Sequence, residues 1–268
     1  IMSKEVQHCY SQTQTNVEEK FKLKKIVKRD FLLIPLYVLA IFILPDLFAN
    51  ITTWILAIVN GYLSEDYLNS FYNDASTVYA FVGEAIVILI FYLLHKRTMI
   101  TTAMTKIKEL KKYIPLLIIC ALSTEVFTSL WEYSIDFLPE QYQYYETVNE
   151  EGIEELFTHT WITPILFIDI VIFTPIIEEL LFRHLIIHEL GKKLTYGLMY
   201  IVSIVGFTYF HCTDAVSPFE AGPYFIAAVV FVIGYHFSHR NLAVPIALLM
   251  ISNLIALKKL LLHKRILL

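Results

Sequence analysis

The sequence has few charged residues for its length, and they are unevenly distributed. Only 17% of the 268 residues are Asp, Glu, Lys or Arg, and 57% are hydrophobic, whereas about a quarter of an ordinary soluble domain is charged. The mean hydropathy is +0.59. The charges gather between long apolar runs, and runs of this kind require lipid around them. The shortage of charge therefore argues against a soluble protein and predicts an integral membrane protein.

Other absences narrow the class further. There are only three cysteines, Cys9, Cys120 and Cys212, an odd number without metal-type spacing, which argues against a disulfide framework. Basic residues occur beside the apolar runs, where membrane topology explains them, so we expect a lipid bilayer as partner and no nucleic acid. We expect no cleavable signal peptide, because the first 30 residues are polar and longer than an ordinary n-region. No internal repeat or low-complexity linker divides the rest of the chain.

The apolar runs approach the length of about 20 residues that a helix needs to cross hydrocarbon. Backbone polar groups in lipid must be paired internally, so helices are expected throughout. The predicted fold class is all-α, a polytopic transmembrane bundle of about 7–8 helices, with a cytoplasmic segment 1–30 and one membrane domain 31–268. The expected segments cover 31–63 (one bent crossing), 76–95, 114–131, 161–190, 194–211, 222–238 and 242–257.

Lys and Arg near the ends of the spans predict the orientation. We expect a multi-pass protein of the cell membrane with a cytoplasmic N-terminus. In that orientation the cytoplasmic side carries the basic residues in 20–29, 96–112 and 192–193, together with Arg240. The loop 132–160 then faces outward, with eight acids and neither Lys nor Arg. The basic residues from Lys258 onward break the pattern, and they leave open whether a further half-crossing exists or the last helix violates the rule.

The fourth apolar segment carries the densest charges within an apolar run, where each charge needs a reason. Glu178 and Glu179 follow Pro175, and Arg183 is the i+4 neighbour of Glu179 on the same helix face. One acid can stay ionised beside Arg183 while the other acts as a general base. A purely structural ion pair that pins helices together is an equally good interpretation of this motif alone.

Two further polar residues fall at a similar depth. Glu178 is about 21 Å from Lys192, His211 about 27 Å from Lys193, and Asn253 about 20 Å from Arg240, at 1.5 Å per helical residue. Taken alone, His211 is more typical of an interfacial histidine, and Asn253 of an interhelical hydrogen bond. The shared depth favours a common site.

The ordered set Glu-Glu-x-x-x-Arg, Phe-x-x-x-His (Phe207 to His211) and a proline-containing last helix with Asn resembles the CPBP family, the CAAX-protease and bacteriocin-processing intramembrane proteases. The resemblance covers about 161–257. A second Glu-Glu pair at 154–155 lies in a polar loop and has His159 where the arginine would be. The resemblance implies a protease in which Glu178 activates water, Glu179 and Arg183 support the site, His211 positions the water or moves protons, and Asn253 stabilises the oxyanion.

One position departs from the family pattern. The last motif is His-x-x-x-Asn or His-x-x-x-Asp, but this chain has Leu249 where the histidine belongs. One oxyanion donor commonly contributes about 100- to 1000-fold in rate. The departure therefore predicts a weakened or inactive site. His236 and His239 are about 20 and 15 Å from position 249 along a helix and do not replace it.

The cofactor stays open, because zinc and a metal-free glutamate mechanism are equally compatible with the resemblance. His184 and His188, an i, i+4 pair, form with Glu189 a separate candidate metal-binding group, although such histidines are more often surface or packing residues.

Three functions are therefore compared. The first is an intramembrane endopeptidase acting on a peptide or membrane-protein substrate. The second is a non-catalytic relative that binds peptides or serves in bacteriocin immunity, motivated by Leu249. The third is a small transporter with a polar path through Glu84, Glu125, Asp169 and Glu178, although no broken-helix repeat supports it.

Overall fold

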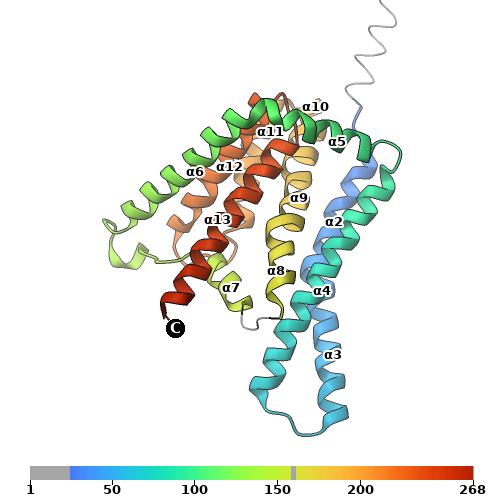
Figure 1. Ribbon diagram of the computed structural model, residues 1–268, viewed down its shortest axis with the longest axis vertical. Helices are drawn as coiled ribbons and strands as arrows, with labels where there is room; N and C mark the ends of the chain where they lie inside the picture. The colour runs from blue at the N-terminus through green and yellow to red at the C-terminus, as the bar shows by residue number, and fades with distance from the viewer. Residues whose placement is uncertain (1–24, 158–160, 268) are drawn as a thin grey trace, which may run out of the picture.

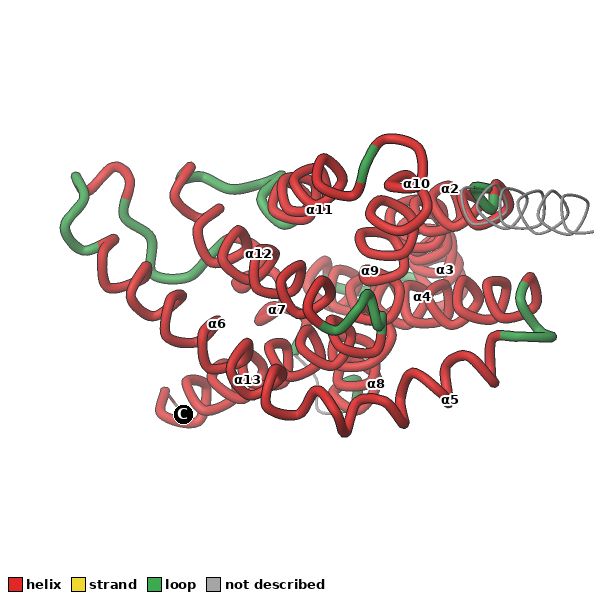
Figure 2. Tube along the Cα trace, turned by 90° about the horizontal axis from the view of Figure 1, so that it is seen from above, coloured by secondary structure: helices red, strands yellow, loops and turns green. Residues whose placement is uncertain are grey.

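The computed structural model describes residues 25–157 and 161–267. The remainder, including Cys9, His159 and most of the predicted segment 1–30, lies outside the described residues. Within the described residues the chain consists of helices and loops without strands (Figures 1 and 2). Five helical stretches are long and apolar enough to cross a membrane, which confirms the prediction of a helical membrane bundle.

The first crossing is one helical run from Lys28 to Asn60. It comprises η1 (Lys28–Leu32), α2 (Leu33–Val38), the π-helical η2 (Leu39–Ile43) and α3 (Leu44–Asn60). The π-helical turn comes directly before Pro45, which has no N–H to donate and crowds the preceding carbonyls. The single long crossing predicted from the sequence is thereby confirmed.

The second crossing is longer than predicted. Helix α4 spans Glu65–Leu94 and begins at Ser64, whose Oγ accepts a hydrogen bond from the Tyr67 backbone N–H at 3.3 Å. The predicted segment 76–95 missed its first turns, because they are polar. Figure 1 shows α3 and α4 side by side as a hairpin, and the two helices make extensive contact.

The basic stretch between the second and third crossings is helical and not a plain loop. Helix α5 (Met99–Glu109) and the short η3 (Leu110–Tyr113) lead directly into α6 (Ile114–Ile135). No side chain of α5 is buried, and Figure 1 shows the helix along one end of the bundle. Pro115 stands in the first turn of α6, where its missing N–H costs nothing.

The acidic loop 132–160 has local structure of its own. It contains η4 (Glu140–Tyr142) and α7 (Val148–Leu156), which starts with a capping box between Thr147 and Glu150. The buried Glu220 carboxylate accepts the backbone N–H of Val148 at 2.9 Å, and Thr147 Oγ1 lies 2.7 Å from Tyr224 Oη. These bonds tie the loop to the start of helix α12.

The predicted fourth segment forms the central helix, a continuous helical run 163–194. It comprises α8 (Thr163–Ile168), the π-helical η5 (Asp169–Phe173), α9 (Thr174–Glu179), the π-helical η6 (Leu180–Leu190) and α10 (Gly191–Leu194). Figure 1 shows it in the middle of the molecule, with α2, α3 and α4 on one side and α6, α12 and α13 on the other.

The remaining elements complete the bundle. They are α11 (Tyr196–Phe210), η7 (Pro218–Glu220), α12 (Ala221–Phe237) and α13 (Ala243–Leu267). Helix α13 is a single helix, so among the described residues there is no further half-crossing. Lys259 Nζ lies 3.0 Å from Glu125 Oε2, and this ion pair offsets a basic charge at the end of the helix that breaks the predicted pattern.

Two apolar clusters hold the central helix from opposite sides. One joins it to α2 and α4, and the other to α11, α12 and α13. The central helix is therefore surrounded by protein, which is the only environment in a membrane where its charges avoid lipid. The first cluster includes Leu33, Tyr37, Val87, Ile177 and Leu185; the second includes Phe182, Phe207, Phe231, Leu248 and Leu249.

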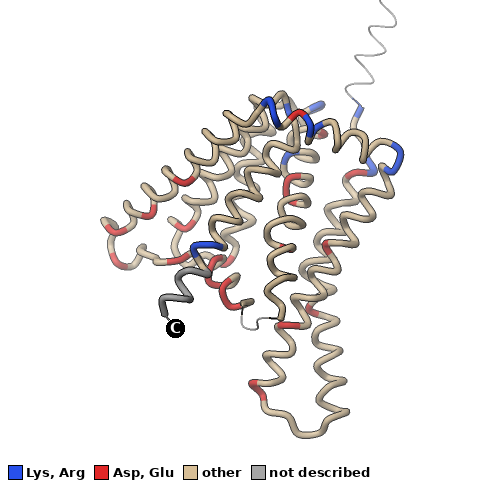
Figure 3. Tube along the Cα trace, viewed as in Figure 1, with Lys and Arg blue, Asp and Glu red and all other residues tan. Residues whose placement is uncertain are grey.

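Most of the basic residues gather at one end of the bundle, around α5 and α10, and a second basic stretch lies near the end of α13 (Figure 3). Acidic side chains are spread along the helices and toward the opposite end. This segregation agrees with a multi-pass membrane protein. The assignment of the basic end to the cytoplasm stays a prediction.

Candidate active site

Glu178 and Glu179 lie on the buried central helix. Glu179 and Arg183 have no exposed surface, and Glu178 is 4% exposed. The two acids occupy the last turn of α9, directly before the π-helical η6. π-helical turns are rare and often mark functional positions. The helix thus presents two carboxyl groups inside the bundle.

Arg183 compensates the charge of Glu179. Its Nη1 lies 2.9 Å from Glu179 Oε1, as the i, i+4 spacing predicts, and Nη2 donates to the Ala228 carbonyl oxygen at 3.5 Å. The guanidinium also stands over the rings of Phe207 and Phe231, 5.0 and 5.6 Å from their centroids. Arg183 therefore has a carboxylate, a carbonyl and two aromatic faces around it, which is how a buried charge is tolerated.

His211 brings a second functional group to Glu178. It is the residue after α11, and its Nε2 lies 3.6 Å from Glu178 Oε1. Its Nδ1 lies 2.9 Å from the Phe207 carbonyl oxygen. A carbonyl can only accept, so Nδ1 carries the hydrogen and Nε2 of the neutral ring is the acceptor facing Glu178.

The separation between Glu178 and His211 has a chemical consequence. At 3.6 Å the two atoms are too far apart for a direct hydrogen bond. A carboxylate oxygen and an imidazole lone pair are both acceptors, and one water molecule can donate to both. The arrangement can therefore hold and polarise a water.

Tyr224 contributes to this site, and the sequence analysis missed it. Its ring stacks on the His211 ring with centroids 5.1 Å apart and an interplanar angle of 21°. The Phe207 ring lies 4.3 Å from the same imidazole. Nothing in the apolar first turn of α12 distinguishes this tyrosine from a packing residue, so no sequence signal identifies it.

Asn253 has a different partner from the one its motif suggests. Its Nδ2 donates to the Ile170 carbonyl oxygen at 2.8 Å. Ile170 precedes Glu178 by eight residues, about 12 Å along a helix. Asn253 thus packs on the central helix, but its amide is bonded two turns away from Glu178. Its oxyanion role stays a prediction.

Position 249 faces the same helices as expected from its spacing to Asn253, but it is part of the apolar core. Leu249 is 4% exposed and belongs to the cluster that contains Phe182 and Phe207. A leucine here supplies no hydrogen-bond donor and keeps water out. The histidine of the family pattern is thus replaced by a leucine that packs in the apolar core.

The other intramembrane acids do not all lie together. Thr174 Oγ1 donates to Glu84 Oε1 at 3.0 Å, whereas Glu125 is paired with Lys259 on the outside of the bundle. Asp169 interacts with Glu84 through a side-chain hydrogen bond, so it is Glu125 that lies apart from the path. This arrangement gives the transporter hypothesis no support.

Metal binding at Glu178 and His211 lacks a third ligand in the described part of the chain. The one group of three metal-ligating side chains found there consists of Asp30, His184 and Glu189. Zinc sites use three or four protein ligands. We therefore derive no step through a metal at Glu178.

One comparison with known proteins finds a family for the segment that carries these residues. Residues 158–255 match the family model described as type II CAAX prenyl endopeptidase Rce1-like. No curated protein and no solved structure matches the chain. The match confirms the resemblance to CPBP intramembrane proteases, and the matched segment contains Glu178, His211 and Asn253.

Proposed function

We propose that this protein is an intramembrane endopeptidase that hydrolyses peptide bonds of a peptide or membrane-protein substrate. The observation that carries the proposal is the 3.6 Å separation of Glu178 Oε1 and His211 Nε2, with the opposite ring nitrogen donating to Phe207 O. A water held by both groups has its oxygen lone pairs free to attack a carbonyl carbon. The family match of residues 158–255 supports the same reaction class.

The roles follow from the positions of the groups. Glu178 takes a proton from water as the oxygen bonds to the substrate carbonyl carbon, and the carbonyl becomes an oxyanion. Glu178 then returns the proton to the leaving amine as the C–N bond breaks. His211 orients the water, and the fixed hydrogen on Nδ1 keeps its Nε2 lone pair aimed at it.

Glu179 and Arg183 support the site without contacting water in this scheme. Their 2.9 Å ion pair keeps a positive charge about one turn from Glu178 inside the bundle. That charge attracts a carboxylate formed at the neighbouring acid. We expect that removing either Glu179 or Arg183 disturbs the site, because the residue that remains is then a buried charge without its partner.

The test is cleavage of candidate membrane peptides by the purified full-length protein in liposomes. Glu178→Gln keeps the shape of the side chain but removes the base, and we expect turnover to fall by about 100-fold or more. Glu155→Gln is the matched control, because it changes the exposed acid of the other Glu-Glu pair. Equal turnover of wild type and Glu178→Gln on every cleaved peptide would overturn the proposal.

A further inference from the structure

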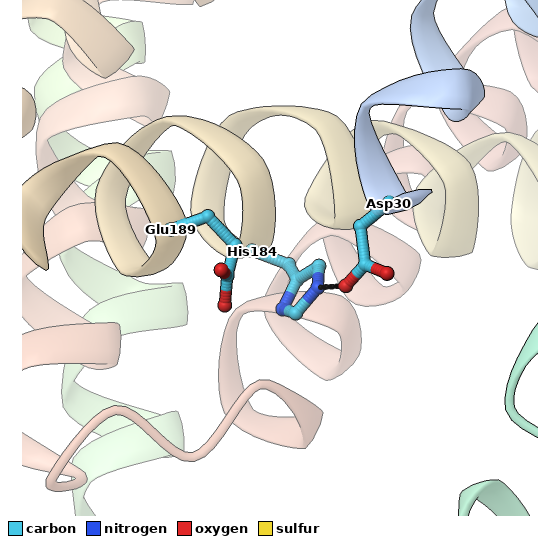
Figure 4. Close-up of side chains that lie close together, drawn as sticks. All are labelled: Asp30, His184 and Glu189. Carbon is cyan, nitrogen blue, oxygen red and sulfur yellow. Dashed lines mark hydrogen bonds and ion pairs between the residues drawn. The ribbon is translucent and has the colours of Figure 1, made fainter. Parts of the chain in front are cut away.

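A second polar cluster lies at the basic end of the bundle, outside the Glu178–His211 site. Asp30 of η1 reaches His184 and Glu189 of η6, although 154 residues separate Asp30 from His184. One ligand atom from each of the three side chains lies within 4.8 Å of the others. Figure 4 shows His184 and Glu189 extending from the central helix and Asp30 meeting the imidazole from the first helix.

Burial makes this cluster unusual. Asp30 and Glu189 are each 1% exposed, and isolated buried carboxylates are costly unless a charge or hydrogen bonds compensate them. Asp30 Oδ2 lies 2.8 Å from His184 Nε2. Asp30 Oδ1 is buried without a hydrogen bond, even though His95 Nε2 stands 3.0 Å away from it. One buried carboxylate oxygen thus faces an imidazole nitrogen without hydrogen-bond geometry.

We propose that Asp30, His184 and Glu189 bind one divalent first-row transition-metal ion, such as Zn²⁺. Imidazole nitrogens suit these ions, while Mg²⁺ and Ca²⁺ prefer oxygen alone. Zinc binds nitrogen and carboxylate oxygen at about 2.0–2.2 Å, so tetrahedral ligand atoms lie about 3.3 Å apart. The three ligand atoms lie within 4.8 Å of one another, so each separation has to shorten by about 1.5 Å at most to reach that spacing.

The cluster corrects the composition of the metal group considered from the sequence. His188 stacks on His184 with ring centroids 5.9 Å apart, but it is absent from the close group, and Asp30 takes its place. No sequence pattern links Asp30 to His184, because the contact arises only when the first helix packs on the central one.

Lys192 competes with the proposed metal ion for Glu189. Its Nζ lies 2.5 Å from Glu189 Oε1, so it occupies a carboxylate oxygen that the metal needs. Glu189 Oε2 meanwhile accepts the Val27 backbone N–H at 2.7 Å. Lys192 is therefore a built-in competitor of the metal. A bound ion displaces the ammonium from the Glu189 carboxylate.

The ion acts as a clamp in this proposal. It joins the start of the first helix to η6, which also carries Arg183. Binding stabilises the folded protein by mass action, since the ligands converge only in the native state. The proposal does not depend on the protease reaction, because none of its ligands contacts Glu178 or His211 in the described contacts.

The experiment uses the full-length protein in detergent, stripped with a chelator and titrated with ZnCl₂. Bound zinc per chain, the zinc Kd and the zinc-induced shift in Tm are measured. We expect one zinc at this site, a raised Tm, and at least tenfold weaker binding in Asp30→Asn and His184→Gln. Lys192→Gln is expected to bind zinc several-fold more tightly than wild type.

Glu178→Gln and His211→Gln are the controls and should retain wild-type zinc affinity. Undiminished binding in His184→Gln, weaker binding in Lys192→Gln, or loss of zinc in Glu178→Gln would each overturn the proposal. If Asp30→Asn fails to fold, the comparison of Lys192→Gln with Glu178→Gln still decides it. Failure of the protease assay leaves these binding results unchanged.

Discussion

Asn253 donates its side-chain amide hydrogen to the carbonyl oxygen of Ile170, five residues before Pro175. Ile170 lies in the π-helical turn η5, in which backbone N–H groups pair with carbonyls five residues earlier. Pro175 has no N–H, so the Ile170 carbonyl loses that helical donor. Asn253 supplies the replacement from the last helix.

This relationship predicts a stability effect at Asn253. Asn253→Ala leaves the Ile170 carbonyl without its donor, and we expect the free energy of unfolding to fall by about 1–3 kcal/mol. Thermal unfolding in detergent measures it, with Ser129→Ala on the face of α6 as a control. An unchanged Tm combined with lost cleavage would instead favour the oxyanion role.

The buried ion pair predicts a large effect at Arg183. Arg183→Met leaves Glu179 buried without its partner, and a loss of about 3–5 kcal/mol in unfolding free energy is expected. The double change Arg183→Met with Glu179→Gln should recover part of this loss, because no unpaired charge remains. A double variant as unstable as the sum of the single variants would contradict the pairing.

Tyr224 is expected to position His211 through its ring and not its hydroxyl. Tyr224→Phe keeps the stacked ring and loses only the hydroxyl contacts with Thr147 Oγ1 and Asn149 Nδ2. Tyr224→Ala removes the stack, and a misplaced catalytic group costs up to about 100-fold in rate. We expect kcat to be near wild type in the phenylalanine variant and at least tenfold lower in the alanine variant. Equal kcat in both would exclude a positioning role.

Leu249 decides between a slow protease and a non-catalytic relative. Leu249→His places a donor one helical turn from Asn253, and one oxyanion donor contributes about 100-fold or more in rate. Burying an imidazole in the cluster of Phe182 and Phe207 costs about 1–3 kcal/mol. We therefore expect a lower Tm but a higher kcat, measured well below the variant's Tm.

The control for this experiment is the double variant Leu249→His with Glu178→Gln, which should have no activity above background. Identical background cleavage from wild type, Glu178→Gln and Leu249→His would favour the non-catalytic relative for the peptides tested. A Leu249→His variant that folds and turns over more slowly than wild type would refute the oxyanion argument.

The sequence by itself determined the class of the fold and the pairing within the central helix. Apolar runs of membrane length must become helices, since lipid offers no partner for backbone groups. Glu179 and Arg183 are i, i+4 neighbours and meet on any helix. The approach of His211 to Glu178 was expected from their similar depth, and the structure brings the two side chains within 3.6 Å.

Tertiary structure alone decided the partners of the remaining residues. Asn253 reaches Ile170 because the last helix packs where Pro175 leaves a carbonyl of the central helix without its helical donor. Tyr224 becomes part of the site because α12 brings its ring onto His211. Asp30 meets His184 across 154 residues of chain. These contacts depend on how helices pack side by side, and local residue spacing carries no information about packing between distant segments.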